Sequence, residues 1–251
     1  MTSIGRGFDG VADLYDEVRP PYPPDLYDAI EASAGPLQDA DVLDLAAGTG
    51  IATRELVRRG ARVVAIDPGE PMIRCLRRLS PAVTAAIATA EQLPLRDRRF
   101  DLVACATAWH WLETGPAVAE LRRVLRPRGH IALWWANNRW GSGVDWEDAR
   151  SEVYRRWETS HGSRPVSYSG VTPLQAASDL RRRGLRVVFE QEFLWSRERT
   201  REDHIRALST HSDVIALGDQ KARFLDEVAM ALEPWPVVVE RLWGPLVIAR
   251  V

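Results

Sequence analysis

Residues 42–50 (VLDLAAGTG) predict a buried strand that breaks into a turn of small residues where a helix should begin. Asp67 lies 17 residues after Gly50 and ends a second apolar run at 63–66 (VVAI). A strand, a tight turn, a helix and a second strand ending in a carboxylate form the layout of a nucleoside-binding βαβ unit. This pattern restricts the chain to an α/β fold with a ligand site at the strand ends.

The remaining sequence alternates predicted strands with predicted helices of about ten residues. Strands are expected at residues 41–45, 62–67, 83–88, 100–105, 130–135, 185–193 and 241–251. Helices are expected at residues 50–59, 70–79, 115–125, 173–183, 200–209 and 219–232. Continuous apolar strands are typical of a parallel sheet covered by helices on both faces. The pattern therefore predicts a doubly wound α/β fold.

Three segments depart from this alternation, and we expect them to form lids. Residues 1–34 predict two helices separated by the proline-rich stretch 19–24 (RPPYPP). Residues 139–172 predict an insertion after the fifth strand, and residues 195–235 hold the late helices. A length of 251 residues suits a single domain over 1–251 that carries these elements.

Composition narrows the possible partners. The net charge of −2 gives no basic field for nucleic acid or anionic membrane. No stretch approaches the roughly 20 apolar residues of a membrane span, and the first residues lack the apolar core of a signal peptide. Cys75 and Cys105 lack ligand-type spacing. We expect a cytoplasmic, bacterial protein with no metal, no nucleic-acid partner and no membrane association; the oligomeric state stays open.

The first turn has the chemistry of a nucleoside site. Gly48 and Gly50 permit positive φ and leave no Cβ between the backbone and a ligand. The helix that follows offers free N–H groups to a carboxylate or phosphate. Asp44, inside the strand end, is costly unless it holds hydrogen bonds or a cation. Asp67 can accept hydrogen bonds from both hydroxyls of a ribose.

A dinucleotide site is the first alternative to consider. Its G-x-G-x-x-G fingerprint requires a third small residue, but the β-branched Thr53 occupies that position. The fingerprint also has no use for Asp44. The fit to NAD is therefore poor, and an NAD-dependent reductase stays only as an alternative.

The motif order resembles that of the class I S-adenosylmethionine (SAM)-dependent methyltransferases. Residues 42–50 are similar to their first motif, with alanine where the commonest form has glycine, and Asp67 matches their ribose-binding acid. Residues 88–97 (ATAEQLPLRD) resemble the third motif, with Thr89 replacing its usual aspartate. Residues 100–103 (FDLV) and 121–133 resemble the strand and the helix-turn-strand that follow.

Residues 15–23 (YDEVRPPYP) and the pair His110-Trp111 resemble the small-molecule branch of this family. That branch includes ubiquinone/menaquinone-biosynthesis and trans-aconitate methyltransferases. The resemblance implies a seven-stranded, mostly parallel, Rossmann-like sheet with the last strand antiparallel, and SAM as the cofactor. The residues expected to bind SAM are Asp44, Ala46, Gly48, Gly50, Asp67, Pro68, Met72, Ala90, Glu91, Ala106, Tyr15 and Arg19.

Two histidines are candidates for catalysis. His110 follows the fourth strand and could act as a general base near neutral pH, or it could only shape the pocket. His211, from a late lid helix, is the second candidate. Aromatic and amide side chains suit a flat or apolar acceptor, although core packing is the alternative. The residues expected to contact the acceptor are Trp111, Trp135, Asn137, Asn138 and Trp140.

These features predict methyl transfer from SAM to O, N or C of a small-molecule metabolite, by in-line displacement. The SAM methyl group is already electrophilic, so the protein need only align a nucleophile and exclude water. A non-catalytic, methyltransferase-like interaction module is the second alternative. The sequence leaves the acceptor open.

Overall fold

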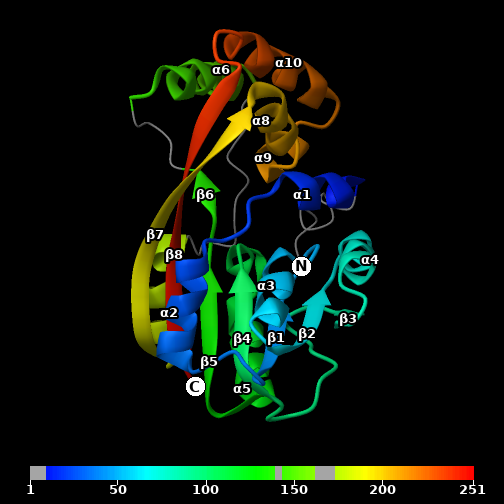
Figure 1. Cartoon of the computed structure of the whole chain (residues 1–251), viewed down its shortest axis with the longest axis vertical. Coiled ribbons are helices and arrows are strands. Elements are labelled where there is room, and N and C mark those ends of the chain that lie inside the picture. The colour runs from blue at the N-terminus through cyan, green and yellow to red at the C-terminus, as the bar shows by residue number, and fades with distance from the viewer. Residues whose placement is uncertain (1–9, 139–142, 162–172) are drawn as a thin grey trace.

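The computed structural model describes residues 10–138, 143–161 and 173–251. Its central element is a mixed eight-stranded sheet with the order β3-β2-β1-β4-β5-β8-β6, in which β7 also pairs with β8 (Figure 1). The predicted doubly wound α/β class is confirmed. The strand beyond the expected seven is the two-residue β6 (Asn137–Asn138).

Five parallel strands form the half of the sheet that the motifs predicted. They are β1 (Asp41–Leu45), β2 (Arg62–Asp67), β3 (Thr84–Ile87), β4 (Phe100–Ala106) and β5 (Leu125–Trp134). Every residue of β1 is buried, as a strand covered on both faces requires. The fifth strand begins at Leu125 rather than at residue 130, because Phe100 already pairs with Leu125 before a register shift.

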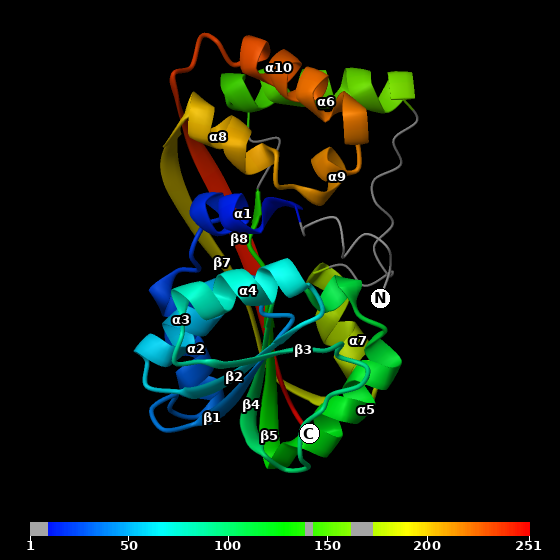
Figure 2. The same ribbon diagram turned by 90° about the vertical axis from the view of Figure 1, so that its right-hand side faces the viewer.

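Helices cover both faces of this sheet (Figure 2). On one face, α2 (Pro24–Ala34) and α3 (Ile51–Arg58) pack through buried side chains such as Leu26 and Leu56. On the other face, α5 (Thr114–Val124) and α7 (Ala176–Arg182) pack through Leu121 and Leu180. The helix α4 (Glu70–Leu79) follows β2 and contacts β2 and β3.

Two long strands reach beyond the sheet. β7 (Arg186–Thr200) and β8 (Val237–Arg250) pair antiparallel along their lengths, and β8 also pairs antiparallel with β5. The sequence predicted only 185–193 and 241–251, because the charged stretch at 196–201 does not read as a strand. Cross-strand pairing of opposite charges, such as Arg197 opposite Glu240, stabilises this extension.

A layer of helices lies beyond the carboxyl ends of the parallel strands (Figures 1 and 2). It comprises α1 (Ala12–Val18), α6 (Asp145–His161), α8 (Arg201–Leu208), α9 (Ser212–Ile215) and α10 (Lys221–Ala231). Its own apolar cluster includes Trp146, Leu208, Phe224 and Val238. The short helical turns are η2 (Trp109–Trp111), η3 (Pro173–Gln175) and η4 (Gly218–Gln220). In the part of the chain that the structure describes, no helix has the length and apolar character of a membrane span.

Candidate active site

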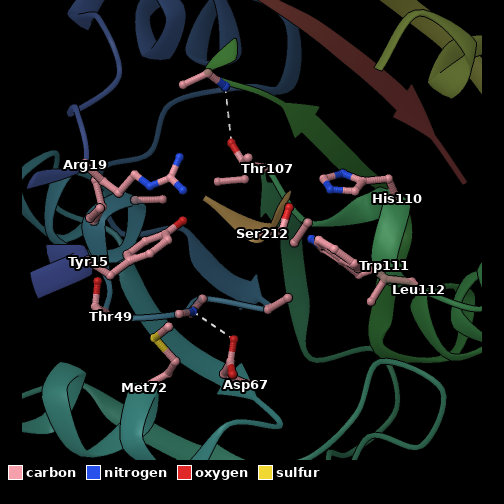
Figure 3. A pocket seen from close by; sticks show the side chains of 18 of the residues that line it. Tyr15, Arg19, Thr49, Asp67, Met72, Thr107, His110, Trp111, Leu112 and Ser212 are labelled. Carbon is pink, nitrogen blue, oxygen red and sulfur yellow. Dashed lines mark hydrogen bonds between the residues drawn. The ribbon is translucent and has the colours of Figure 1, made fainter. Parts of the chain in front are cut away.

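A cavity of about 560 Å³ lies between the ends of the central strands and the layer of helices. Figure 3 shows Tyr15 and Arg19 on one side of it, His110 and Trp111 on the other, and Thr107 and Ser212 between them. The predicted residues that line it are Tyr15, Arg19, Ala46, Gly48, Asp67, Pro68, Met72, Ala90, Glu91, Ala106, His110, Trp111, Asn137, Asn138 and His211. Most of the predicted site thus converges on one cavity.

The two glycines of the first turn have different surroundings. Gly48 has φ +57°, and a Cβ built on it would meet nothing within 4 Å, so its open side is cavity. Gly50 has φ +88°, but its Cβ would lie 2.9 Å from Cγ of Leu76. Gly50 does not line the cavity. The prediction that Gly50 leaves room for the cofactor is therefore corrected, because this glycine allows α4 to pack against the turn.

Asp67 connects the turn to the second strand. Its Oδ2 accepts a hydrogen bond from the backbone N–H of Gly48 at 2.9 Å, and its Oδ1 accepts one from the N–H of Gly69 at 2.8 Å. Each carboxylate oxygen can accept more than one hydrogen bond. Asp67 also lines the cavity, so the backbone holds its carboxylate in place on the cavity wall.

Asp44 lies behind the turn rather than in the cavity wall. It is fully buried, its Oδ2 accepts a hydrogen bond from Thr53 Oγ1 at 2.5 Å, and its Oδ1 has no hydrogen-bond partner among the described residues. Burial raises the pKa of Asp44 to about 7; repulsion from Asp67 adds to the rise and the Thr53 bond opposes it. Because Asp44 does not line the cavity, its position does not provide a direct contact with a ligand.

The helix α1 and the residues after it form one wall of the cavity. The guanidinium of Arg19 donates from Nε to Thr210 Oγ1 at 3.1 Å and from Nη2 to Thr210 O at 2.9 Å, and it lies 4.8 Å from the ring centre of Tyr15. Tyr22 and Thr107 are joined by a hydrogen bond of 3.0 Å between their hydroxyls. Contacts between segments far apart in the sequence thus join parts of the cavity wall.

The opposite wall is built on η2. His110 is 9% exposed, and its Nδ1 accepts a hydrogen bond from Nε1 of Trp135 at 3.1 Å. Trp109 of the same turn donates to Asp179 of α7 at 3.4 Å. Burial lowers the pKa of His110 to about 4, so the ring is neutral at pH 7. Burial, with the positive charge of Arg19 as a smaller cause, also lowers the pKa of His211.

The fold places Trp135, a predicted acceptor contact, in the core. Trp135 is fully buried and does not line the cavity, so the expectation that it touches the acceptor is corrected. Its side chain lies behind His110, on the core side of the strand. Trp140 lies outside the described residues.

Sequence reasoning did not select several residues of the cavity wall: Thr49, Thr107, Ser212, Asp213 and Trp243. Thr107 directly follows the end of β4, so its position after a strand tip was the available signal. Trp243 comes to the site because β8 pairs with Asn137, and no local pattern indicates that pairing. Among the described residues, no group of three His, Cys, Asp or Glu side chains could hold a metal ion.

A glycine turn and a strand-tip carboxylate on one cavity, at the carboxyl ends of parallel strands, are the features of a nucleoside-binding α/β fold. Comparison with known proteins agrees, because residues 43–133 match the methyltransferase domain family. The chain is therefore similar to methyltransferases in sequence over residues 43–133 and in fold over most of its length, which agrees with the predicted class I methyltransferase family.

Three relatives illustrate the match. An uncharacterized methyltransferase of Mycobacterium tuberculosis is 43% identical over 132 residues, which are 53% of each chain. A malonyl-[acyl-carrier protein] O-methyltransferase of Halorhodospira halophila is 37% identical over 51% of this chain and 46% of its own. The chain thus spans about half the length of these curated relatives. A solved structure from Anaeromyxobacter dehalogenans, assigned as a type II methyltransferase, superposes with a TM-score of 0.68 at 26% identity, covering 92% of this chain and 97% of that one.

Proposed function

We propose that this protein binds SAM in the cavity and transfers its methyl group to O, N or C of a small-molecule acceptor, by in-line displacement. The observation that carries the proposal is the hydrogen bond of 2.9 Å between Gly48 N and Asp67 Oδ2. This bond places the Gly48 backbone, which has no side chain, next to the Asp67 carboxylate, which can accept hydrogen bonds from hydroxyl groups, on one cavity wall. An adenosyl ligand requires both features.

The residues present fit SAM on four counts. The open side of Gly48 leaves space beside the turn, and Asp67 can accept hydrogen bonds from the ribose hydroxyls. Ala90 and Glu91, with Pro68 and Met72, would border the adenine. Arg19 carries a positive charge on the cavity wall, suited to the carboxylate of the methionine part.

SAM, when bound, supplies an electrophilic methyl group on a sulfonium, so the protein needs no covalent nucleophile. The protein contributes by positioning the acceptor and by excluding water. Trp111, Asn137, Asn138 and Trp243 form an aromatic and amide surface that would orient the acceptor. His110 and His211, both neutral at pH 7, are the titratable groups on the cavity wall beside this surface.

The acceptor is proposed to be a small molecule. The cavity has the size of a small-molecule site, and the net charge of −2 offers no general attraction for nucleic acid. The relative from Halorhodospira halophila is named for an acyl-carrier-protein substrate. Because this chain spans only about half the length of that relative, the relative's substrate is not carried over, and the accepting atom stays open among O, N and C.

Calorimetric titration with SAM and with NAD tests the cofactor assignment. We expect SAM to bind and NAD not to bind, and Asp67→Asn to weaken SAM binding by about tenfold or more, because the amide can no longer accept on both atoms. Asp219→Asn, at an exposed position of η4, is the matched control and should bind SAM normally. Tight NAD binding would overturn the proposal. SAM binding without turnover across a broad acceptor screen with labelled SAM would favour a non-catalytic module.

A further inference from the structure

The hydrogen bond between Trp135 and His110 determines which ring nitrogen of the histidine carries the proton. An indole Nε1–H only donates, so His110 Nδ1 must accept across the 3.1 Å contact. Burial keeps the ring neutral, and a neutral imidazole has one N–H. The proton therefore resides on Nε2.

The geometry places that N–H toward the cavity. Nδ1 sits beside Cγ at the base of the ring, whereas Nε2 lies at its tip. Figure 3 shows the His110 ring pointing from its backbone toward the cavity, and His110 is one of the lining residues. Trp135 occupies the base of the ring from the core side, where it is fully buried.

From this arrangement we propose that His110 is a hydrogen-bond donor to an oxygen atom of the methyl acceptor, and that Trp135 is the positioning residue that fixes its tautomer. The inference rests on the proposed function, whose acceptor it narrows to a compound with a carbonyl or carboxylate oxygen beside the reacting atom. His110 is then not the base that removes a proton, because its outward nitrogen already carries one.

The surroundings of His110 agree with an oxygen-bearing, flat acceptor. Asn137 lines the cavity, and its Nδ2 is buried without a hydrogen-bond partner among the described residues. A buried amide N–H that finds no acceptor costs free energy, so a ligand oxygen would relieve it. Trp111 and Trp243 add aromatic surface to the same cavity. An aromatic carboxylate such as benzoate has both features and serves as the probe.

The tautomer can be measured without any ligand, by two-bond ¹H–¹⁵N correlation spectra of histidine-labelled protein, with the His110 signals assigned from their loss in His110→Gln. We expect the Nε2–H form in the wild type. Trp135→Phe should mix the two tautomers. Trp109→Phe is the matched control, because it also replaces a fully buried indole donor of this region but does not touch Nδ1. An Nδ1–H ring in the wild type, or unchanged spectra in Trp135→Phe, would overturn the proposal.

Binding of the probe tests the donor role. Benzoate should bind to protein saturated with S-adenosylhomocysteine and shift the His110 Nε2–H resonance, whereas benzylamine should not. His110→Ala should weaken benzoate about tenfold or more, and His110→Gln should recover most of this loss, because its amide N–H can take the place of Nε2–H. Absence of benzoate binding, or equal losses in the two variants, contradicts the proposal. Failure of S-adenosylhomocysteine to bind would instead contradict the proposed function, and it would leave the tautomer result intact.

Discussion

The backbone N–H of Gly48 donates a hydrogen bond of 2.9 Å to Oδ2 of Asp67, joining the turn after β1 to the tip of β2. The parallel pairing of Leu45 with Ile66 brings these two segments together. The second oxygen of Asp67 is fixed by Gly69 N. The two parts of the sequence motif are therefore one structural unit, and the backbone orients the carboxylate independently of a ligand.

Substitution of each glycine of the turn should separate binding from stability. Gly48→Ala places a methyl group in the open space of the cavity and should weaken SAM binding about tenfold. Gly50→Ala forces a contact of 2.9 Å with Leu76 and should lower the free energy of unfolding by about 2 kcal/mol or more. Both variants carry the strain of positive φ, so each controls for the other. Calorimetry and thermal unfolding measure the two effects; equal losses of affinity would refute the division.

Ala46 adopts φ +55°, a conformation that is costly for any residue with a Cβ. Ala46→Gly should relieve this strain and raise the free energy of unfolding by about 0.5–1 kcal/mol. Ala47 is not among the residues with positive φ, so Ala47→Gly should lower the free energy of unfolding by a similar amount through the entropy of the unfolded chain. Thermal unfolding of the two variants gives the comparison. A lower melting temperature for Ala46→Gly would mean that its methyl group contributes packing that outweighs the strain.

The sequence was sufficient to predict the parallel half of the fold and most of the cavity wall, because those features depend on local patterns. The turn and Asp67 are such features. Trp135 could not be placed, because a buried tryptophan beside a site and one within it look alike in sequence. The reach of β7 to Thr200 also escaped prediction, since its charged residues are stabilised by pairing with β8, a contact distant in the chain.

Asp44 gives the folded protein an unusual pH dependence. Burial raises its pKa from the ordinary 3.8 to about 7. Between these values the unfolded chain releases the proton and the folded chain keeps it. The stability contributed by the neutral carboxyl is present below pH 3.8 and is lost as pH rises through 7. Asparagine does not titrate, so the free energy of unfolding of Asp44→Asn, relative to wild type, should rise by about 2–4 kcal/mol from pH 4 to pH 8.

Asp41, at the start of the same strand, supplies a control of opposite sign. The Arg62 guanidinium, with those of Arg126 and Arg99, holds the pKa of Asp41 below its usual range. Its contribution is present above pH 3.8 and is lost as pH falls below it. Asp41→Asn should therefore be destabilised relative to wild type at pH 4 and above. Denaturant titrations over this pH range measure both variants. Parallel curves for Asp44→Asn and wild type would show that Asp44 is ionised throughout.

Glu240 of β8 connects the ribbon formed by the paired strands β7 and β8 to the helices over the cavity. The Glu240 side chain is buried, with 3% of its residue surface exposed. Its Oε2 accepts a hydrogen bond from Arg197 Nε at 2.5 Å and lies 3.3 Å from Arg199 Nε. Its Oε1 lies 2.7 Å from His204 Nδ1. These partners hold the pKa of Glu240 at about 2 against the opposing effect of burial. Arg199 and Arg197 also donate to Val18 O at the end of α1. The carboxylate thus stabilises the attachment of α1 to the ribbon.

Glu240→Gln should leave two arginines without their counter-charge and lower the free energy of unfolding by about 2–4 kcal/mol. Because α1 carries Tyr15 and leads to Arg19 in the cavity wall, SAM binding should weaken as well. Glu198→Gln is the matched control, since Glu198 is exposed on the neighbouring strand, and it should change neither property. Thermal unfolding and calorimetry measure both effects. Loss of stability with full SAM affinity would mean that α1 keeps its position in the cavity wall without Glu240, and would contradict this prediction.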